Sequence, residues 1–297
     1  MNDPRLAFAG LLVGVLVGTT GMGGGSLLTP ILVLLFGFDP GVAIGTDILH
    51  GAIFKSFGAV RHRTLGTVHA RLASWMLLGS APMSLVGVAL SSWLVRNYGD
   101  GVQSVQAQVL GVALVFGGLG LFLRSVISRR NVSDAPFLLS NRDRLIAFSL
   151  GFFGGFIVGL TSVGSGTFFG LVMILAFPLT ARKIVGTDIF HAAVLLWVAG
   201  FGHFVAGNVD MTAVGWLLLG SIPGVLLGSQ VSVRVPEQAL RVSLATVLVA
   251  SGIKLADVPD STGLMIAALG VGFALALLLE LRSRRLNGRI ATPAPEP

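Results

Sequence analysis

The sequence lacks cysteine altogether and carries little charge. None of its 297 residues is cysteine, which excludes disulfides, thiol nucleophiles and cysteine-based metal sites. Charged residues make up 11%, less than half of the roughly 25% usual in soluble domains. Hydrophobic residues make up 54%, and the mean hydropathy is +0.88. A soluble fold of this size needs more charge to cover its surface, so the composition predicts a polytopic membrane protein.

Acidic residues are also scarce: 13 Asp and Glu stand against 20 Lys and Arg, a net charge of +7. In a membrane protein, basic cytoplasmic loops and anionic lipid headgroups explain this balance, so we expect a lipid bilayer and no nucleic acid as partner. Metalloprotease, nucleophile-elbow, Walker and dinucleotide motifs are absent from the sequence, and its histidines form no compact metal-binding pattern. We therefore expect no enzyme, no cofactor and no metal.

The chain contains an internal duplication. The segment Gly45-Thr46-Asp47-Ile48-Leu49-His50 returns as Gly186-Thr187-Asp188-Ile189-Phe190-His191, at an offset of 141 residues. The same offset aligns Gly79-Ser80-Ala81-Pro82 with Gly220-Ser221-Ile222-Pro223. It also aligns three glycines spaced by four, which we assign to helix packing: Gly10, Gly14 and Gly18 with Gly151, Gly155 and Gly159.

The duplication and the apolar stretches divide the chain into five parts. We expect repeats at 1–124 and 145–260, a linker at 125–144, an extra transmembrane helix at 261–281 and a tail at 282–297. Within them the apolar stretches predict seven transmembrane helices, at about 41–60, 71–95, 103–124, 183–203, 211–233, 238–254 and 262–281.

Each repeat opens with an ambiguous apolar run, 6–36 or 145–178, interrupted by Gly, Ser and Thr. A continuous helix of this length would reach roughly 46 Å, too long for an untilted hydrocarbon core of about 30 Å. Each run is therefore either one broken, tilted span or a re-entrant hairpin of two half-helices. Spanning runs make the two repeats parallel, whereas hairpins make them inverted.

The distribution of basic residues favours the hairpins. With hairpins and a cytoplasmic C-terminus, 16 Lys and Arg lie inside and 3 outside, against 10 and 9 for spanning runs. Loop 61–71 carries three arginines, and its counterpart 202–212 carries none. We thus predict an all-α protein of the plasma membrane with two inverted repeats, each a re-entrant hairpin plus three transmembrane helices. The linker and the C-terminus are then cytoplasmic.

The two breaks are candidate binding sites for a small oxyanion. Irregular backbone at membrane depth is costly unless it lines a cavity or binds a ligand. The second half-helices would direct unpaired N–H groups toward the breaks, glycine allows close approach, and hydroxyls add donors. The candidate substrate-binding residues are Thr20, Gly23, Gly24, Gly25, Ser26, Thr161, Ser162, Gly164, Ser165 and Gly166.

Ionisable residues inside the membrane form a second set of candidates. Asp47 and His50 share a helix face, and Asp188 and His191 repeat the arrangement. Two roles remain open: relay of a coupling proton, or capping of backbone N–H groups by the aspartates. Lys55 has Leu196 as its counterpart. Three roles are open for its ammonium: neutralising Asp47, attracting the anion, or extending to the cytoplasmic face, and we expect the last of these.

With these residues in view, the sequence resembles the sulfite exporter TauE/SafE family over residues 6–281. The resemblance is carried by the motif GxGGGSLLTP at 21–30, by Gly-Thr at 45 and 186, and by Gly-x-Val at 66 and 207. Asp47 and Asp188 depart from the pattern, where we expect serine in many members. The resemblance implies transport of sulfite, sulfonates, sulfoacetate or related small anions, commonly export.

We therefore expect a secondary transporter of a small anion, with a proton as the coupling ion. Two alternatives stay open, an anion channel and a structural or assembly membrane protein that moves nothing. A homo-oligomer is compatible with each of these three functions.

Overall fold

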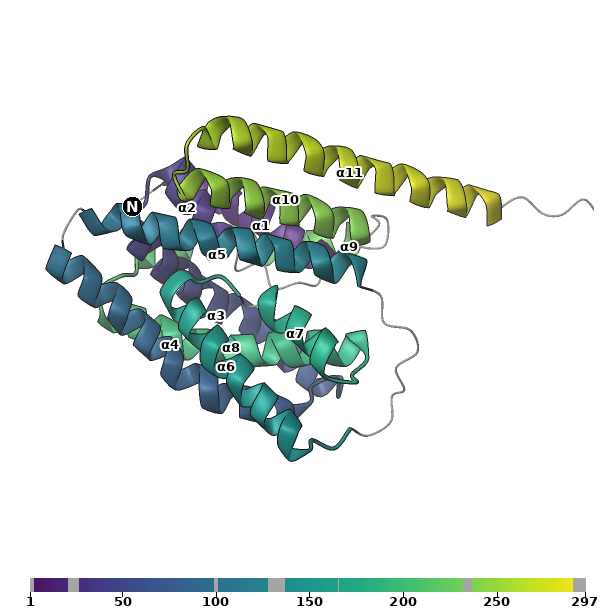
Figure 1. The fold of residues 1–297 in the computed structure, drawn as a ribbon, viewed down its shortest axis with the longest axis horizontal. Helices are drawn as coiled ribbons and strands as arrows, with labels where there is room; N and C mark the ends of the chain where they lie inside the picture. The colour runs from purple at the N-terminus through teal and green to yellow at the C-terminus, as the bar shows by residue number, and fades with distance from the viewer. Residues whose placement is uncertain are drawn as a thin grey trace, which may run out of the picture.

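A computed structural model describes residues 3–20, 27–98, 101–127, 137–164, 166–231 and 237–290. Within these ranges all regular secondary structure is α-helical (Figure 1). The first repeat holds α1 (Arg5–Thr20), α2 (Leu28–Phe36), α3 (Pro40–Thr64), α4 (Ala70–Tyr98) and α5 (Gly101–Val126). The second holds α6 (Asn141–Thr161), α7 (Phe168–Ala176), α8 (Ala181–Val205), α9 (Met211–Val231), α10 (Glu237–Leu255) and α11 (Ser261–Ile290). The predicted helices are all present, and α11 continues beyond its predicted end at 281.

The chain is a multi-pass membrane protein. In the part that the structure describes, 7 helices are long and apolar enough to cross a bilayer: α4, α5, α6, α8, α9, α10 and α11. Helix α3 has the length but falls short in hydropathy, because Asp47, His50 and Lys55 lie along it. These three side chains are buried inside the protein, where they do not meet lipid.

Both opening runs are broken into two helices. The second helix of each pair, α2 or α7, has 9 residues and reaches only about 13 Å, too short to cross a bilayer. Phe177 follows α7 and packs on Phe137, which precedes α6, with ring centroids 6.4 Å apart. The segment α6–α7 therefore leaves at the end where it entered, as a re-entrant hairpin does.

The first helix of the second hairpin is longer than predicted. Helix α6 has 21 residues, about 31 Å, and is a full-length helix instead of a half-helix. Its start lies in the polar linker, where Ser140 and Asp143 form a capping box ahead of the apolar run. The prediction of half-helices is thus right for α7 and wrong for α6.

The opening helix of each repeat packs along a helix of the other repeat. Helix α1 lies along α9, and α6 lies along α4. A Cβ at Gly14 would collide with the backbone of Ser221, and one at Gly155 with the backbone of Ser80. The four-residue glycine spacing serves helix packing, as predicted, because it brings the backbones into direct contact.

Equivalent helices of the two repeats lie side by side and run in opposite directions. Along α3 and α8, Gly51 faces Leu196 while Gly58 faces Ile189, so the numbers rise on one helix as they fall on the other. Helices α5 and α10 are also antiparallel, because Gly111 lies at Gly252 and Gly118 at Ala245. Inverted repeats would place equivalent helices in this way, and their orientation across a bilayer stays a prediction.

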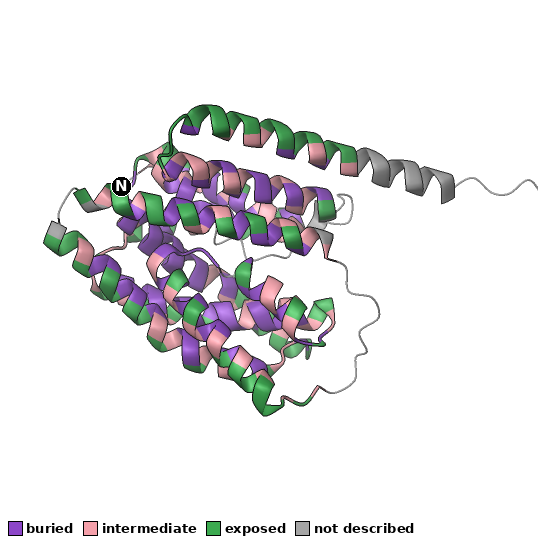
Figure 2. Cartoon of the chain, viewed as in Figure 1, coloured by how far each residue is buried: buried purple, intermediate pink, exposed green. Residues whose placement is uncertain are grey.

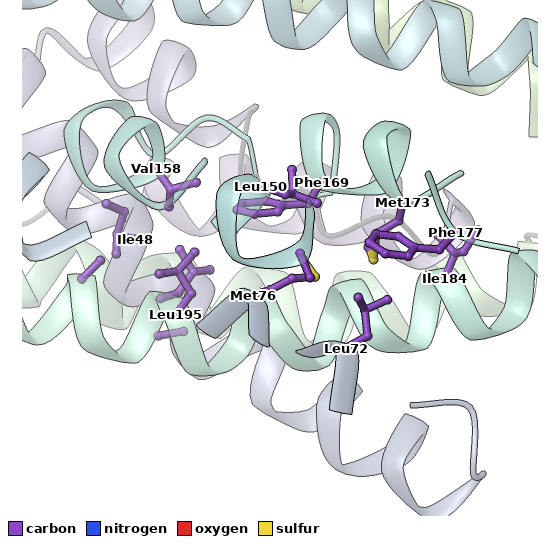
Figure 3. Packing of buried hydrophobic residues seen from close by; sticks show 14 of the residues in the cluster. Ile48, Leu72, Met76, Leu150, Val158, Phe169, Met173, Phe177, Ile184 and Leu195 are labelled. Carbon is purple, nitrogen blue, oxygen red and sulfur yellow. The ribbon is translucent and has the colours of Figure 1, made fainter. Parts of the chain in front are cut away.

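Among the described residues, hydrophobic clusters hold the helices together around the hairpins. The largest joins α3, α4 and α8 to the second hairpin, and Figure 3 shows Phe169 of α7 beside Leu150 of α6 within it. A second cluster joins the first hairpin to α9, through Leu28 and Leu217 among others. The described part of α11 packs mainly on α10 and is otherwise largely exposed (Figure 2). The buried centre therefore lies between the two repeats.

Candidate functional site

The break of the second hairpin has an unusual backbone. Ser162 ends α6 with φ 63°, a left-handed conformation that costs a non-glycine residue about 1–2 kcal/mol. The carbonyl of Gly164 then accepts the N–H groups of the first residues of α7, with N–O distances of 3.1 Å from Phe168 and 3.3 Å from Phe169. In this conformation those donors of the tip are bonded within the protein.

Asp47 joins the two hairpins. Its Oδ2 accepts hydrogen bonds from the hydroxyl of Thr29, in the first turn of α2, and from the hydroxyl of Ser162, at 2.8 Å. Asp47 also accepts the backbone N–H of Thr29. The side chain is 1% exposed, and Oδ1 has no hydrogen-bond partner among the described residues. The start of α2 and the break between α6 and α7 therefore meet on one carboxylate.

Asp188 occupies the equivalent place in the second repeat, with different partners. Where the first repeat has Thr29, the second has Gly170, and a Cβ there would collide with Nη1 of Arg124 and lie 3.3 Å from Oδ2 of Asp188. Arg124 donates from Nη1 to the carbonyl of Gly166 at 2.7 Å, and Asp188 accepts the N–H of Gly166. A guanidinium from α5 thus takes the space of the missing hydroxyl and compensates the charge of Asp188.

Lys55 belongs to the same charged cluster as the two aspartates. It is 4% exposed and interacts electrostatically with both Asp188 and Asp47. The expectation that its side chain extends to the cytoplasmic face is wrong, because two buried carboxylates attract the ammonium more strongly than a distant aqueous surface does.

The Gly-Thr pair of each duplicated motif anchors a loop of the other repeat. Thr46 accepts the N–H of Asp210, just before α9, at 3.0 Å, and Thr187 accepts the N–H of His69, just before α4, at 2.9 Å. The glycine before each threonine gives the loop backbone room to approach: a Cβ at Gly45 would collide with the carbonyl of Asn208. The pair is therefore structural.

The histidine of each motif bonds to a serine of the other repeat. His50 Nε2 and Ser221 Oγ are 2.9 Å apart, as are His191 Nε2 and Ser80 Oγ. Both serines precede the helix prolines Pro223 and Pro82 by two residues. These bonds occupy one nitrogen of each imidazole and cross-link the repeats symmetrically.

A cavity of about 590 Å³ leads toward this centre. Helices α1, α3, α8 and α9 line it with mostly apolar side chains, together with Lys55, Arg61 and His62. A smaller cavity, lined by Asp47 and His50 among others, shares Val17, Phe54 and Lys55 with the large one. Lys55 therefore stands where the cavity meets the buried carboxylate.

The structure brings together part of the predicted site. Asp47 meets Ser162, and Asp188 meets Gly166, whereas the hydroxyl of Thr161 donates to the carbonyl of Ile157. Gly164 supplies the carbonyl described above, and Thr20 ends α1. The other candidates, Gly23, Gly24, Gly25, Ser26 and Ser165, lie outside the described residues. In the described part of the chain no group of three or more His, Asp or Glu side chains is arranged to hold a metal ion.

Sequence reasoning missed Arg124 and Thr29, and it did not pair Ser80 and Ser221 with the histidines. Arg124 lies near the end of a helix, next to a basic linker, and was counted with the linker charges. The repeat alignment does hold a signal, because it pairs Thr29 with Gly170 and so marks a place where the two halves differ. Only the packing of α5 against α7 shows what fills that place.

Broken hairpins that meet on buried charges define a polytopic membrane protein of the transporter class. The model of the family described as sulfite exporter TauE/SafE matches residues 6–255, and the chain belongs to this family. It is therefore a TauE/SafE-family membrane transporter.

Similar proteins are named as transporters as well. The chain is 37% identical over 247 residues to the probable membrane transporter protein YjnA of Bacillus subtilis, covering 83% of this chain and 96% of that one. It is 24% identical over 267 residues to the probable membrane transporter protein MJ0441 of Methanocaldococcus jannaschii, covering 84% and 94%. A shorter match, 35% identity over 98 residues, covers 33% of this chain and 22% of the sulfite exporter TauE/SafE family protein 1 of Arabidopsis thaliana. No solved structure matches the chain.

Proposed function

We propose that this protein is a secondary transporter that exports small sulfur-containing anions, of the sulfite, organosulfonate or sulfoacetate type, across the plasma membrane. The observation that carries the proposal is the centre itself. Two broken hairpins meet on Asp47, and two buried cations, Lys55 and Arg124, lie in the same charged cluster. The linker and the C-terminus are cytoplasmic in this proposal.

Buried cations favour an anion as the substrate. An ammonium and a guanidinium are costly inside a membrane protein unless they are paired, and a small oxyanion pairs well with both. The cavity beside Lys55 gives such an anion a path inward, and Arg61 and His62 add basic groups along it. The names of the family and of the Arabidopsis relative support sulfite or a related anion.

Buried carboxylates favour a proton as the coupling ion. Asp47 and Asp188 are both nearly inaccessible, and each has one oxygen without a hydrogen-bond partner among the described residues. Burial of such a carboxylate in a dry interior favours its protonated form unless a cation beside it compensates the charge.

Binding and flux of defined anions test the proposed function. The purified protein is heated with sulfite, sulfate, thiosulfate, taurine, sulfoacetate or acetate, and flux of the stabilising anions is then measured in proteoliposomes. We expect sulfite or a sulfonate to raise the unfolding temperature and to cross with saturation. Stabilisation by none of these anions, together with no flux, would contradict the proposal. Saturation-free flux with no counter-transport would instead identify a channel.

A serine pair provides the matched variants. Ser162→Ala removes a hydroxyl at the hairpin tip, whereas Ser74→Ala removes an exposed hydroxyl of α4. We expect the first to weaken anion binding and the second to leave it unchanged. Equal binding by both variants would place the site away from the tip.

A further inference from the structure

We propose that Asp47 is the residue that carries the coupling proton, and that a monovalent anion bound beside Lys55 crosses together with this proton, so that transport moves no net charge. The inference rests on the proposed function and adds the proton carrier and the charge of the cycle. It is carried by the balance of the buried charges and by the different partners of the two aspartates.

The buried Asp, Lys and Arg side chains balance one another. Among the described residues they are Asp47, Asp188, Lys55 and Arg124, two of each sign. Binding of an anion gives this dry centre an uncompensated negative charge, which is costly to bury. A proton taken up on one carboxylate removes the excess. Anion and proton therefore bind as a pair, and each favours the other.

Arg124 disfavours Asp188 as the proton carrier. Its guanidinium and the Asp188 carboxylate converge on the space left open at Gly170. A guanidinium is always charged and only donates hydrogen bonds, so it favours the ionised form of Asp188, and Asp47 has no guanidinium contact of this kind among the described residues.

Asp47 has partners that suit both of its protonation states. Hydroxyl groups of Thr29 and Ser162 contact its Oδ2. A hydroxyl donates to a carboxylate and, after rotation, accepts from a carboxylic acid. Oδ1, which has no hydrogen-bond partner among the described residues, is the atom that takes the proton.

Of the groups around Asp47, Lys55 is the cation whose pairing changes when Asp47 is protonated. On α3 itself the neighbours are His50 and Lys55. Helix α8 contributes Asp188, which shares Lys55 with Asp47, and two histidines whose Nε2 atoms contact a serine hydroxyl and a backbone carbonyl. Helix α2 offers the Thr29 hydroxyl, α9 offers the Ser221 hydroxyl to His50, and α5 offers Arg124 to Asp188. When Asp47 becomes neutral, Lys55 exchanges one carboxylate for the substrate anion.

Both species reach the centre by one route. The cavity that holds Lys55 and Arg61 adjoins the small cavity at Asp47. A hydronium ion in the cavity gives a proton to Oδ1 as the anion reaches Lys55. One of its O–H bonds breaks, the new O–H bond forms on Asp47, and a neutral water molecule remains. On the other side the anion leaves, and the same O–H bond breaks to return the proton to water.

Flux under a controlled membrane potential tests the inference. Proteoliposomes take up methanesulfonate, whose sulfonate stays ionised, so any accompanying proton is carried by the protein. We expect accumulation to follow the pH gradient and to ignore the potential. A bare monovalent anion would instead change its accumulation about 50-fold per 100 mV. Accumulation that follows the potential would overturn the inference. If methanesulfonate does not cross, sulfite is used at a pH where it is mostly monovalent. If neither anion crosses, the result contradicts the proposed function itself.

Asparagine variants assign the proton. Asp47→Asn mimics the protonated residue, so its flux should lose the response to pH and gain the 50-fold response to potential. Asp188→Asn should leave the potential without effect, whatever flux remains. Asp257→Asn, on the exposed turn after α10, serves as the control. If Asp188→Asn, and not Asp47→Asn, loses the pH response and gains the response to potential, the assignment is overturned.

Thr29→Val provides a second readout if Asp47→Asn fails to insert. It removes one donor that favours the ionised carboxylate, so half-maximal flux should occur at higher pH. An unchanged pH profile would count against Asp47.

Discussion

At the residue scale, the duplicated Gly-Thr-Asp-x-x-His motif gives each of its residues a separate task. The glycine admits a loop, the threonine holds that loop, the aspartate meets a hairpin and the histidine binds a serine. All four tasks include a contact with the other repeat. The motif is therefore a connector between the halves as much as a part of the site.

The threonines of the motif give a test at this scale. Thr46→Val and Thr187→Val keep the shape but leave the N–H of Asp210 or His69 without its acceptor. We expect each to lower the free energy of unfolding by about 1–3 kcal/mol. Thr64→Val, on the exposed end of α3, should stay within about 0.5 kcal/mol of the parent protein. Thermal unfolding in detergent measures all three, and equal midpoints would contradict the anchoring role.

At the scale of elements, glycine contacts fix how the hairpins sit. Helices α4 and α6 touch through backbone atoms at Gly151, Gly155 and Gly159, and α1 and α9 repeat the pattern. Such contacts leave no volume for a methyl group, so the long first helix of each hairpin is held firmly. The short helices α2 and α7 begin beside these long helices, and their first turns meet the charged centre.

A methyl group at one of these glycines tests the support. Gly155→Ala would place its Cβ against the Ser80 backbone and push α4 and α6 apart. We expect a loss of about 1–3 kcal/mol in stability. Gly215→Ala in α9 is the matched control, since nothing lies within 4 Å of its Cβ. The control should gain slightly from the higher helix propensity of alanine, and a loss equal to that of Gly155→Ala would contradict the packing account.

At the scale of the whole molecule, the helices and their breaks were predictable because hydropathy is a local property of the chain. The duplication was visible because the repeated motif can be read directly from the sequence. The asymmetry of the centre was not predictable in the same way. Lys55 was expected at the cytoplasmic face, and Arg124 was counted among the cytoplasmic charges. Both are buried, because burial depends on packing between distant helices. The prediction of the packing glycines succeeded because the four-residue spacing itself produces the contact.

The inverted arrangement makes a prediction for the intact protein. Thr64 and Val205 are equivalent, exposed residues at the ends of α3 and α8, and the native chain has no cysteine. In inverted repeats, Thr64→Cys should react with an impermeant thiol reagent from the cytoplasmic side and Val205→Cys from the outside. Labelling of both from one side would contradict inversion.

The reciprocal bonds between His50 and Ser221 and between His191 and Ser80 have a consequence for the origin of the protein. A single repeat supplies a histidine and a serine that do not meet within it, because each needs its partner from an oppositely running copy. An ancestral half-length chain could satisfy both only as a homodimer whose subunits had inserted in both orientations. With both copies in one chain, equivalent positions can differ, and this is what lets Lys55 have Leu196 as its counterpart and Thr29 have Gly170.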